Sequence, residues 1–203
     1  MKTILLQVLI GCMAVSAVAQ NCQQNSVGIT ALSDMPTTVT YQGFQGGLYP
    51  GGTNTRPASH EQAGLHRALA VVPRDVNGQP DPHGRIGFVG IGASNTFAQW
   101  GSFEALASGD PLVNPILVLV NGGQGGQSAE VISDPGAQYW NNLEHRISLH
   151  GISNEQVQVA WFLEAAKATN LTFPEHSMEL RRPASEALKI AQSRFPNLAL
   201  VSI

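Results

Sequence analysis

Ser94 is the residue of this sequence whose surroundings best suit covalent chemistry. It follows an apolar run over residues 86–91 and the two small residues Gly92 and Ala93, which allow a sharp turn. We expect a helix to begin at Ser94, so that backbone N–H groups and the helix dipole stabilise a negative charge developing beside it. This placement favours acyl transfer with Ser94 as nucleophile. The alternative is that Ser94 or Asn95 only caps the helix.

A glycine-rich segment over residues 121–128 follows a second apolar run, residues 116–120. Without side chains, a backbone can approach a ligand closely and point N–H groups at an anion. Gly125 or Gly126 could therefore join the Ser94 N–H as the second donor of an oxyanion hole. One alternative is an ordinary flexible turn between a strand and a helix.

A second alternative for the glycine-rich segment is a phosphate-binding loop that holds a nucleotide. It is the weaker alternative, because no Gly-Lys-Ser/Thr follows the glycines. Gly87, Gly90 and Gly92 also lack the spacing of a dinucleotide-binding motif.

The elements that position these residues follow from hydrophobic patterning. Apolar runs alternate with segments of helical periodicity, which predicts a mainly parallel sheet covered on both faces by helices with right-handed crossovers. Ligands bind such sheets at the carboxyl ends of the strands, so Ser94 and the glycines should lie at one edge. The strands are expected over residues 86–91, 116–120, 157–163 and 198–203.

Helical periodicity predicts which residues face the core. One helix should bury four residues spaced about one turn apart, and a later helix should bury three more before it ends near Gly151. Further helices are expected over residues 61–69 and 184–194. The core-facing sets are Phe97, Trp100, Phe103 and Leu106, then Trp140, Leu143 and Ile147, and we expect Trp161 to pack in the core as well.

The first residues predict export. Lys2, an apolar stretch over residues 4–18 and Ala17-Val18-Ala19 have the layout of a cleavable secretory signal, residues 1–19, that leaves Gln20 first. The stretch is too short and too polar for a permanent membrane span. A secreted or periplasmic protein is expected; the weaker alternative is a lipoprotein modified at Cys12.

The rest of the chain divides into a Gly/Pro-rich arm, residues 20–84, and an α/β domain, residues 85–203. The formal net charge of -3 offers no footprint for nucleic acid. One cysteine, Cys22, remains after cleavage, so no internal disulfide forms, and no Cys/His spacing indicates a zinc site. No metal or other cofactor is expected.

Two of these motifs resemble the SGNH/GDSL hydrolase superfamily, in particular its sialate O-acetylesterase-like and acetylxylan-esterase-like branch. Gly92-Ala93-Ser94-Asn95 is similar to the Gly-x-Ser-Asn motif that carries the nucleophile there, and Gly125-Gly126-Gln127-Ser128 is similar to its oxyanion loop. Gly46-Gly47-Leu48-Tyr49-Pro50-Gly51-Gly52 also resembles the arm of exported bacterial proteins of this type. The resemblance implies a three-layer α/β/α flavodoxin-like sandwich. It also implies serine-dependent hydrolysis of O-acetyl or other carboxyl esters on a small-molecule or carbohydrate-like substrate.

The sequence departs from the superfamily in its third block, where Asn or Gln-Gly-Glu follows the third strand. Here the third strand runs into Glu164, which is the candidate for that position. The alternative for Glu164 is a solvated residue at the end of a strand.

The second departure concerns the base that a serine nucleophile needs, normally a histidine oriented by a carboxylate. The superfamily places both after a fifth strand, whereas this sequence ends on the fourth. We therefore expect a C-terminally truncated domain with an incomplete edge, weak or inactive in catalysis and prone to aggregate. If the base lies within this chain, His60 and His176 are the first suspects among histidines read otherwise as surface or helix residues.

Ester hydrolysis is accordingly the first expected function. The main alternative is an exported carbohydrate-binding or surface protein that has the same fold and no catalytic activity, and nucleotide binding ranks third.

Overall fold

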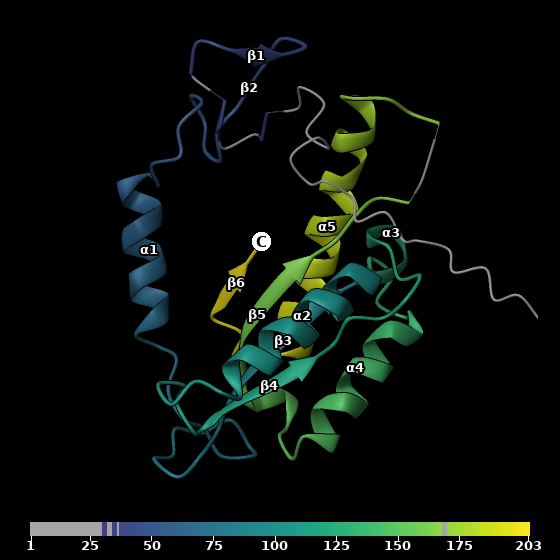
Figure 1. The fold of residues 1–203 in the computed structure, drawn as a ribbon. Helices are drawn as coiled ribbons and strands as arrows, with labels where there is room; N and C mark the ends of the chain where they lie inside the picture. Colours follow the sequence, from purple (N-terminus) through teal and green to yellow (C-terminus); the bar gives the residue numbers. More distant parts are fainter. Residues whose placement is uncertain (1–29, 32–33, 36, 168–169) are drawn as a thin grey trace, which may run out of the picture. The chain divides into compact units, whose positions relative to one another are not determined.

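The computed structural model describes residues 30–31, 34–35, 37–167 and 170–203 (Figure 1). The expected signal segment, Cys12 and Cys22 lie outside the described residues. The chain divides into two compact units, Met1–Pro57 and Ala58–Ile203. None of the helices within the described ranges is both long and apolar enough to cross a lipid bilayer.

The first unit contains a small antiparallel hairpin, β1 (Thr40–Tyr41) and β2 (Phe44–Gln45). Its turn uses Gln42 and Gly43 at positive φ, which glycine adopts readily. A second turn follows, in which the N–H groups of Leu48 and Tyr49 both donate to the Thr53 carbonyl, at 3.1 and 3.0 Å. The glycine-rich arm motif, residues 46–52, thus forms an ordered turn that directly follows the hairpin.

The second unit is built on a four-stranded sheet whose strands all run parallel (Figure 1). The strand order is β4-β3-β5-β6. The strands are β3 (Ile86–Gly92), β4 (Leu117–Asn121), β5 (Val157–Leu163) and β6 (Leu200–Ser202). The expected mixed α/β class with a parallel sheet is confirmed. The fourth strand, expected over residues 198–203, is shorter than predicted, since β6 contains only Leu200–Ser202.

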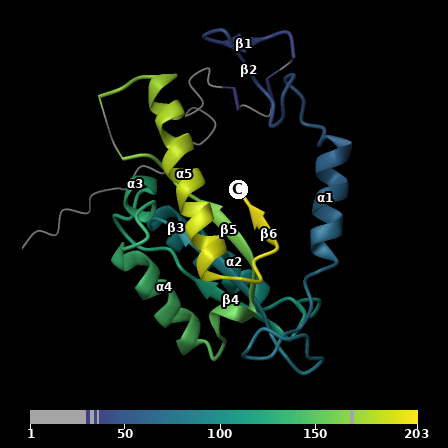
Figure 2. The ribbon, with the colours of Figure 1, turned by 180° about the vertical axis from the view of Figure 1, so that it is seen from behind.

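Helices cover both faces of this sheet, as Figures 1 and 2 show from opposite sides. One face carries α2 (Ser94–Ala107). The other carries α4 (Gln138–Leu149) and α5 (Glu175–Arg194), with the one-turn helix α3 (Ala129–Ile132) between β4 and α4. A further helix, α1 (Ala58–Ala68), lies beside β6.

The main core lies between the sheet and the α4–α5 layer. The predicted apolar face of α4 is confirmed, because Trp140, Leu143 and Ile147 are all at most 1% exposed. They pack with buried residues of the sheet and of α5, among them Val89, Ile91, Ala160, Ala187 and Ala191. Burial of apolar area on this scale is the main force that holds α4 in place.

The predicted apolar face of α2 was wrong for three of its four residues. Trp100 is 1% exposed, but Phe97, Phe103 and Leu106 are 53%, 40% and 77% exposed. Steps of three residues advance about 300° around a helix, so successive members of the set drift by about 60°. Across the whole set the drift reaches about half a turn, and only the middle of the set can face the sheet.

Helix α5 starts nine residues earlier than the periodicity predicted, at Glu175 instead of 184. Pro183 lies inside the helix and is buried. Its missing N–H removes one hydrogen bond from the helix, and the predicted helix began only after this proline.

We predict that Gly90→Ala destabilises the fold by about 1 to 3 kcal/mol, the usual cost of overpacking. A Cβ at Gly90 would lie 2.6 Å from the Trp100 ring, so the ring must move. Urea unfolding followed by tryptophan fluorescence measures the change. The matched control is Gly101→Ala in α2, where an added Cβ meets nothing within 4 Å and should stabilise by about 0.5 to 1 kcal/mol. Equal stability of the two variants would contradict the packing described here.

Candidate functional site

The carboxyl ends of β3, β4 and β5 meet at one edge of the sheet. In the ladder Gly90 pairs with Asn121 and Gly92 pairs with Leu163, so the three strands end side by side. Ser94, the glycine loop and Glu164 follow these strand ends directly. The proposed nucleophile, the glycine loop and the third-block candidate Glu164 therefore lie at the same edge.

Ser94 is the first residue of α2 and its side chain is exposed. The N-cap position belongs to Ala93, and no side chain caps the helix. Ser94 itself makes no side-chain hydrogen bond with any residue that the structure describes. The hydroxyl is thus exposed and does not serve as a cap.

The turn before Ser94 is fixed by Gly92, whose φ of 152° suits glycine alone. A Cβ at this position would run into the Leu163 carbonyl and the Thr96 hydroxyl. The Gly92 N–H donates to the Tyr139 hydroxyl at 2.9 Å, and the Gly92 carbonyl accepts from the Gln124 N–H at 3.0 Å. Both backbone polar groups of this buried residue are therefore satisfied.

Thr96 ties the first turn of α2 to the end of β5. It is fully buried, and its hydroxyl donates to the Leu163 carbonyl at 2.6 Å. Because Leu163 immediately precedes Glu164, this bond fixes the backbone on which Glu164 stands relative to the turn that carries Ser94.

The first half of the glycine loop is held against α2. The Asn121 side-chain amide donates to the Phe97 carbonyl at 3.0 Å, and its oxygen accepts from the Gly123 N–H at 3.1 Å. From α4, Arg146 donates to the carbonyls of Asn121 and Gly123, both at 2.9 Å. A side chain at Gly123 would collide with the Phe97 backbone, which explains the glycine.

The second half of the loop is open. Gly125 and Gly126 are exposed, and an added Cβ at either would meet nothing within 4 Å. Neither of their N–H groups has a backbone acceptor among the described residues. Two successive free N–H groups therefore follow β4, the neighbour of β3, and β3 leads into Ser94.

Glu164 is half-buried at the end of β5. One carboxylate oxygen accepts from the Ala165 N–H at 3.1 Å, and the other is buried with no partner among the described residues. Burial, assisted by the nearby negative charge of Glu130, raises the pKa of Glu164 to about 7. Glu164 therefore exchanges its proton near neutral pH, unlike a solvated glutamate.

Glu130 on α3 behaves in the opposite way. Burial alone would raise its pKa, but hydrogen bonds from the Ser128 side chain and from backbone N–H groups outweigh burial and lower it. Both carboxylate oxygens accept from the Lys167 N–H, at 3.1 and 3.0 Å. Near neutral pH Glu130 is therefore negatively charged, whereas Glu164 is partly protonated. The difference arises because the Glu130 carboxylate accepts several hydrogen bonds and the Glu164 carboxylate accepts one.

The two histidines suspected as the base, His60 and His176, do not follow the strand ends that carry the other candidate residues. His176 lies in the first turn of α5 and acts on the charge of Glu130. Its Nε2 is buried and has no partner within the described part of the chain, so it makes no hydrogen bond to Ser94. His60 lies on α1. Within the described ranges, no group of three His, Cys, Asp or Glu residues could hold a metal ion.

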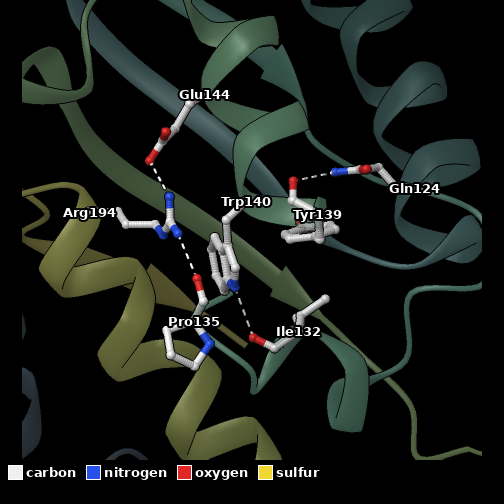
Figure 3. A network of polar contacts seen from close by, with 7 residues as sticks. All are labelled: Gln124, Ile132, Pro135, Tyr139, Trp140, Glu144 and Arg194. Carbon is white, nitrogen blue, oxygen red and sulfur yellow. Dashed lines mark hydrogen bonds and ion pairs between the residues drawn. The ribbon is translucent and has the colours of Figure 1, made fainter. Parts of the chain in front are cut away.

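Helix α4 is anchored on both sides (Figure 3). The Trp140 indole N–H donates to the Ile132 carbonyl at 3.0 Å. From α5, Arg194 pairs with Glu144 at 2.6 Å, donates to the Pro135 carbonyl at 2.7 Å and lies over the Trp140 ring. Tyr139 and Arg146, which hold the strand-end turns, thus stand on a fixed helix.

Sequence reasoning missed Tyr139, Gln124 and Thr96. A tyrosine next to the core face of a predicted helix is the one available signal, and it does not identify the backbone group that the hydroxyl would bind. Comparisons of the chain with models of protein families, with curated proteins and with solved structures found no match.

We predict that Glu130→Gln lowers the pKa of Glu164 below about 7 without returning it to the ordinary value, because burial remains. The glutamine oxygen can still accept from the Lys167 N–H, so the loop keeps its place. Carboxyl NMR titration measures the pKa. The control Glu155→Gln, in the 3-10 turn before β5 at the opposite end of that strand, should leave it unchanged. An unaltered Glu164 pKa in Glu130→Gln would refute the electrostatic coupling.

Proposed function

We propose that this edge of the sheet hydrolyses carboxylic esters, with Ser94 as the nucleophile. The observation that carries the proposal is the pairing of a free, exposed serine hydroxyl at a helix start with free glycine N–H groups after the neighbouring strand. Acyl transfer by a serine uses a nucleophile together with oxyanion donors, and these two turns offer both kinds of group.

In the proposed route, Ser94 Oγ attacks the acyl carbonyl carbon. The carbonyl electron pair moves to oxygen, where the N–H groups of Ser94 and of Gly125 or Gly126 bind the oxyanion. The intermediate collapses, the C–O bond to the alcohol breaks and an acyl-serine ester remains. Water then attacks this ester and releases the carboxylic acid.

Glu164 is the group proposed to exchange protons in these steps. A base works best when its pKa lies near the working pH, and the pKa of Glu164 is about 7. It takes the Ser94 proton as the Oγ–C bond forms and gives it to the departing alcohol oxygen. During deacylation it takes a proton from the attacking water and returns it to Ser94 Oγ as the bond between Oγ and the acyl carbon breaks.

The topology supports the finer proposal of a three-layer flavodoxin-like sandwich of SGNH type. Numbered along the chain, the sheet order β4-β3-β5-β6 is 2-1-3-4, which agrees with the first four strands of the flavodoxin-like order. Ser94 follows the first strand, whose neighbours lie on either side, where ligands bind in such sheets.

The substrate class rests on the resemblance to acetylesterases stated for the sequence motifs. We propose an O-acetyl group on a carbohydrate, processed outside the cytoplasm if residues 1–19 act as the signal they resemble. Fold likeness alone does not define a substrate.

The second candidate is a carbohydrate-binding or surface protein without catalytic activity. A cleft of about 370 Å³ on the α2 side of the sheet favours it. Its lining is almost wholly aromatic, and flat rings offer faces on which the C–H side of a sugar packs. The lining residues are Phe88, Gln99, Trp100, Phe103 and Trp161.

We predict that Ser94→Ala lowers turnover of p-nitrophenyl acetate by a factor of about 10³ or more, because loss of a nucleophile removes the covalent route. The exposed substitution should change stability by only about 0.5 kcal/mol. The control is Ser102→Ala, a second exposed serine of α2, which should keep full turnover. Equal turnover in the two variants would refute the assignment.

A further inference from the structure

Three hydrogen bonds join the turn that carries Ser94 to the glycine loop through one residue of α4. The Tyr139 hydroxyl accepts from the Gly92 N–H at 2.9 Å. The Tyr139 carbonyl accepts from the Gln124 side-chain amide at 2.9 Å (Figure 3). The Gln124 N–H donates to the Gly92 carbonyl at 3.0 Å, which closes a ring of Gly92, Gln124 and Tyr139.

Each strand-end member of this ring lies within two residues of a proposed oxyanion donor. Gly92 lies two residues before Ser94, and Gln124 is next to Gly125. So short a chain leaves little freedom between ring and donor. The ring therefore sets the separation between the Ser94 N–H and the N–H groups of the loop.

The ring is buried, and its outer bonds hold it in place. Tyr139 is 1% and Gln124 8% exposed, and Gly92 is buried between β5 and α4. The remaining Gln124 oxygen accepts from the Asn142 amide at 2.9 Å. A buried group that loses its partner here has no water to replace it.

Packing alone does not explain the hydroxyl. The Tyr139 ring stands edge-on to Trp140, with centroids 5.1 Å apart, and a phenylalanine would fill the same space. Burial raises the pKa of Tyr139, so the hydroxyl stays neutral. What the oxygen adds is an acceptor for one backbone N–H at the turn before Ser94.

We propose that Tyr139 is a positioning residue that, with Gln124, holds the two halves of the oxyanion hole at their working distance. This inference rests on the proposed function and extends it to residues that do not touch the substrate.

The test compares Tyr139→Phe with Ile147→Val, a buried substitution on the same helix that leaves the ring of hydrogen bonds intact. We expect both to lower Tm. Only Tyr139→Phe should lower kcat for p-nitrophenyl acetate, by about 10- to 100-fold with little change in KM, because misplaced donors act on the transition state. Gln124→Met, which keeps length and removes both amide partners, should lower kcat in the same way.

A second readout is independent of turnover. In Tyr139→Phe, amide hydrogen exchange should become faster at Gly92 and Gln124, and the NMR signals of Gly125 and Gly126 should shift, while Ile147→Val leaves these signals in place. Unchanged exchange at Gly92, or a kcat in Tyr139→Phe equal to that of Ile147→Val, overturns the inference. Wild-type turnover that does not depend on Ser94 refutes the proposed function instead, and the exchange measurement then decides the positioning role alone.

Discussion

The structure depends on one backbone position, Gly92, at which three elements meet without room for a side chain. A Cβ there would run into β5 and into the first turn of α2, and α4 supplies the acceptor for its N–H. Because Gly92 is buried, each of its polar groups needs a protein partner. Tyr139 accepts from the Gly92 N–H and Gln124 donates to the Gly92 carbonyl, so both residues lie at the strand end. Ser94, two residues after Gly92, is exposed to solvent at the start of a helix.

The sheet could be predicted because its strands are buried on both faces and so appear as continuous apolar runs. β5 was predicted with its bounds unchanged, and β3 to within one residue. The face of α4 could be predicted because its apolar residues recur at three and four positions, as a helix requires. The face of α2 could not, because repeated steps of three drift around the helix and only tertiary packing decides that Trp100 faces the sheet. The early start of α5 was hidden by Pro183.

That Ser94, Gly125, Gly126 and Glu164 lie at one edge could be predicted from the strand-end rule, and these residues make up the candidate site. Its supporting bonds could not. Tyr139 is 47 residues from Gly92, and Thr96 is 67 residues from Leu163, and in both pairs one partner is a backbone atom. Backbone atoms are the same at every residue, so such bonds leave no signal in side-chain pattern or spacing. The pKa of Glu164 likewise depends on residues distant in the sequence, because it is raised by burial and by the negative charge of Glu130 on α3.

The two glutamates at this edge also differ in what they do for stability. The pKa of Glu164 is higher in the folded chain than its ordinary value of 4.5, so the folded state holds this proton more tightly than the unfolded state. Its contribution to stability is complete below that ordinary value and is lost as the pH rises through about 7. The lowered pKa of Glu130 has the opposite sign: its contribution is present above its ordinary value and is lost as the pH falls through the lowered one. A glutamate whose role is only structural is expected to have a lowered pKa, as Glu130 does, since a lowered pKa stabilises the fold at neutral pH. A carboxyl whose pKa is raised to about 7 is instead typical of a group that transfers protons, which is the role proposed for Glu164.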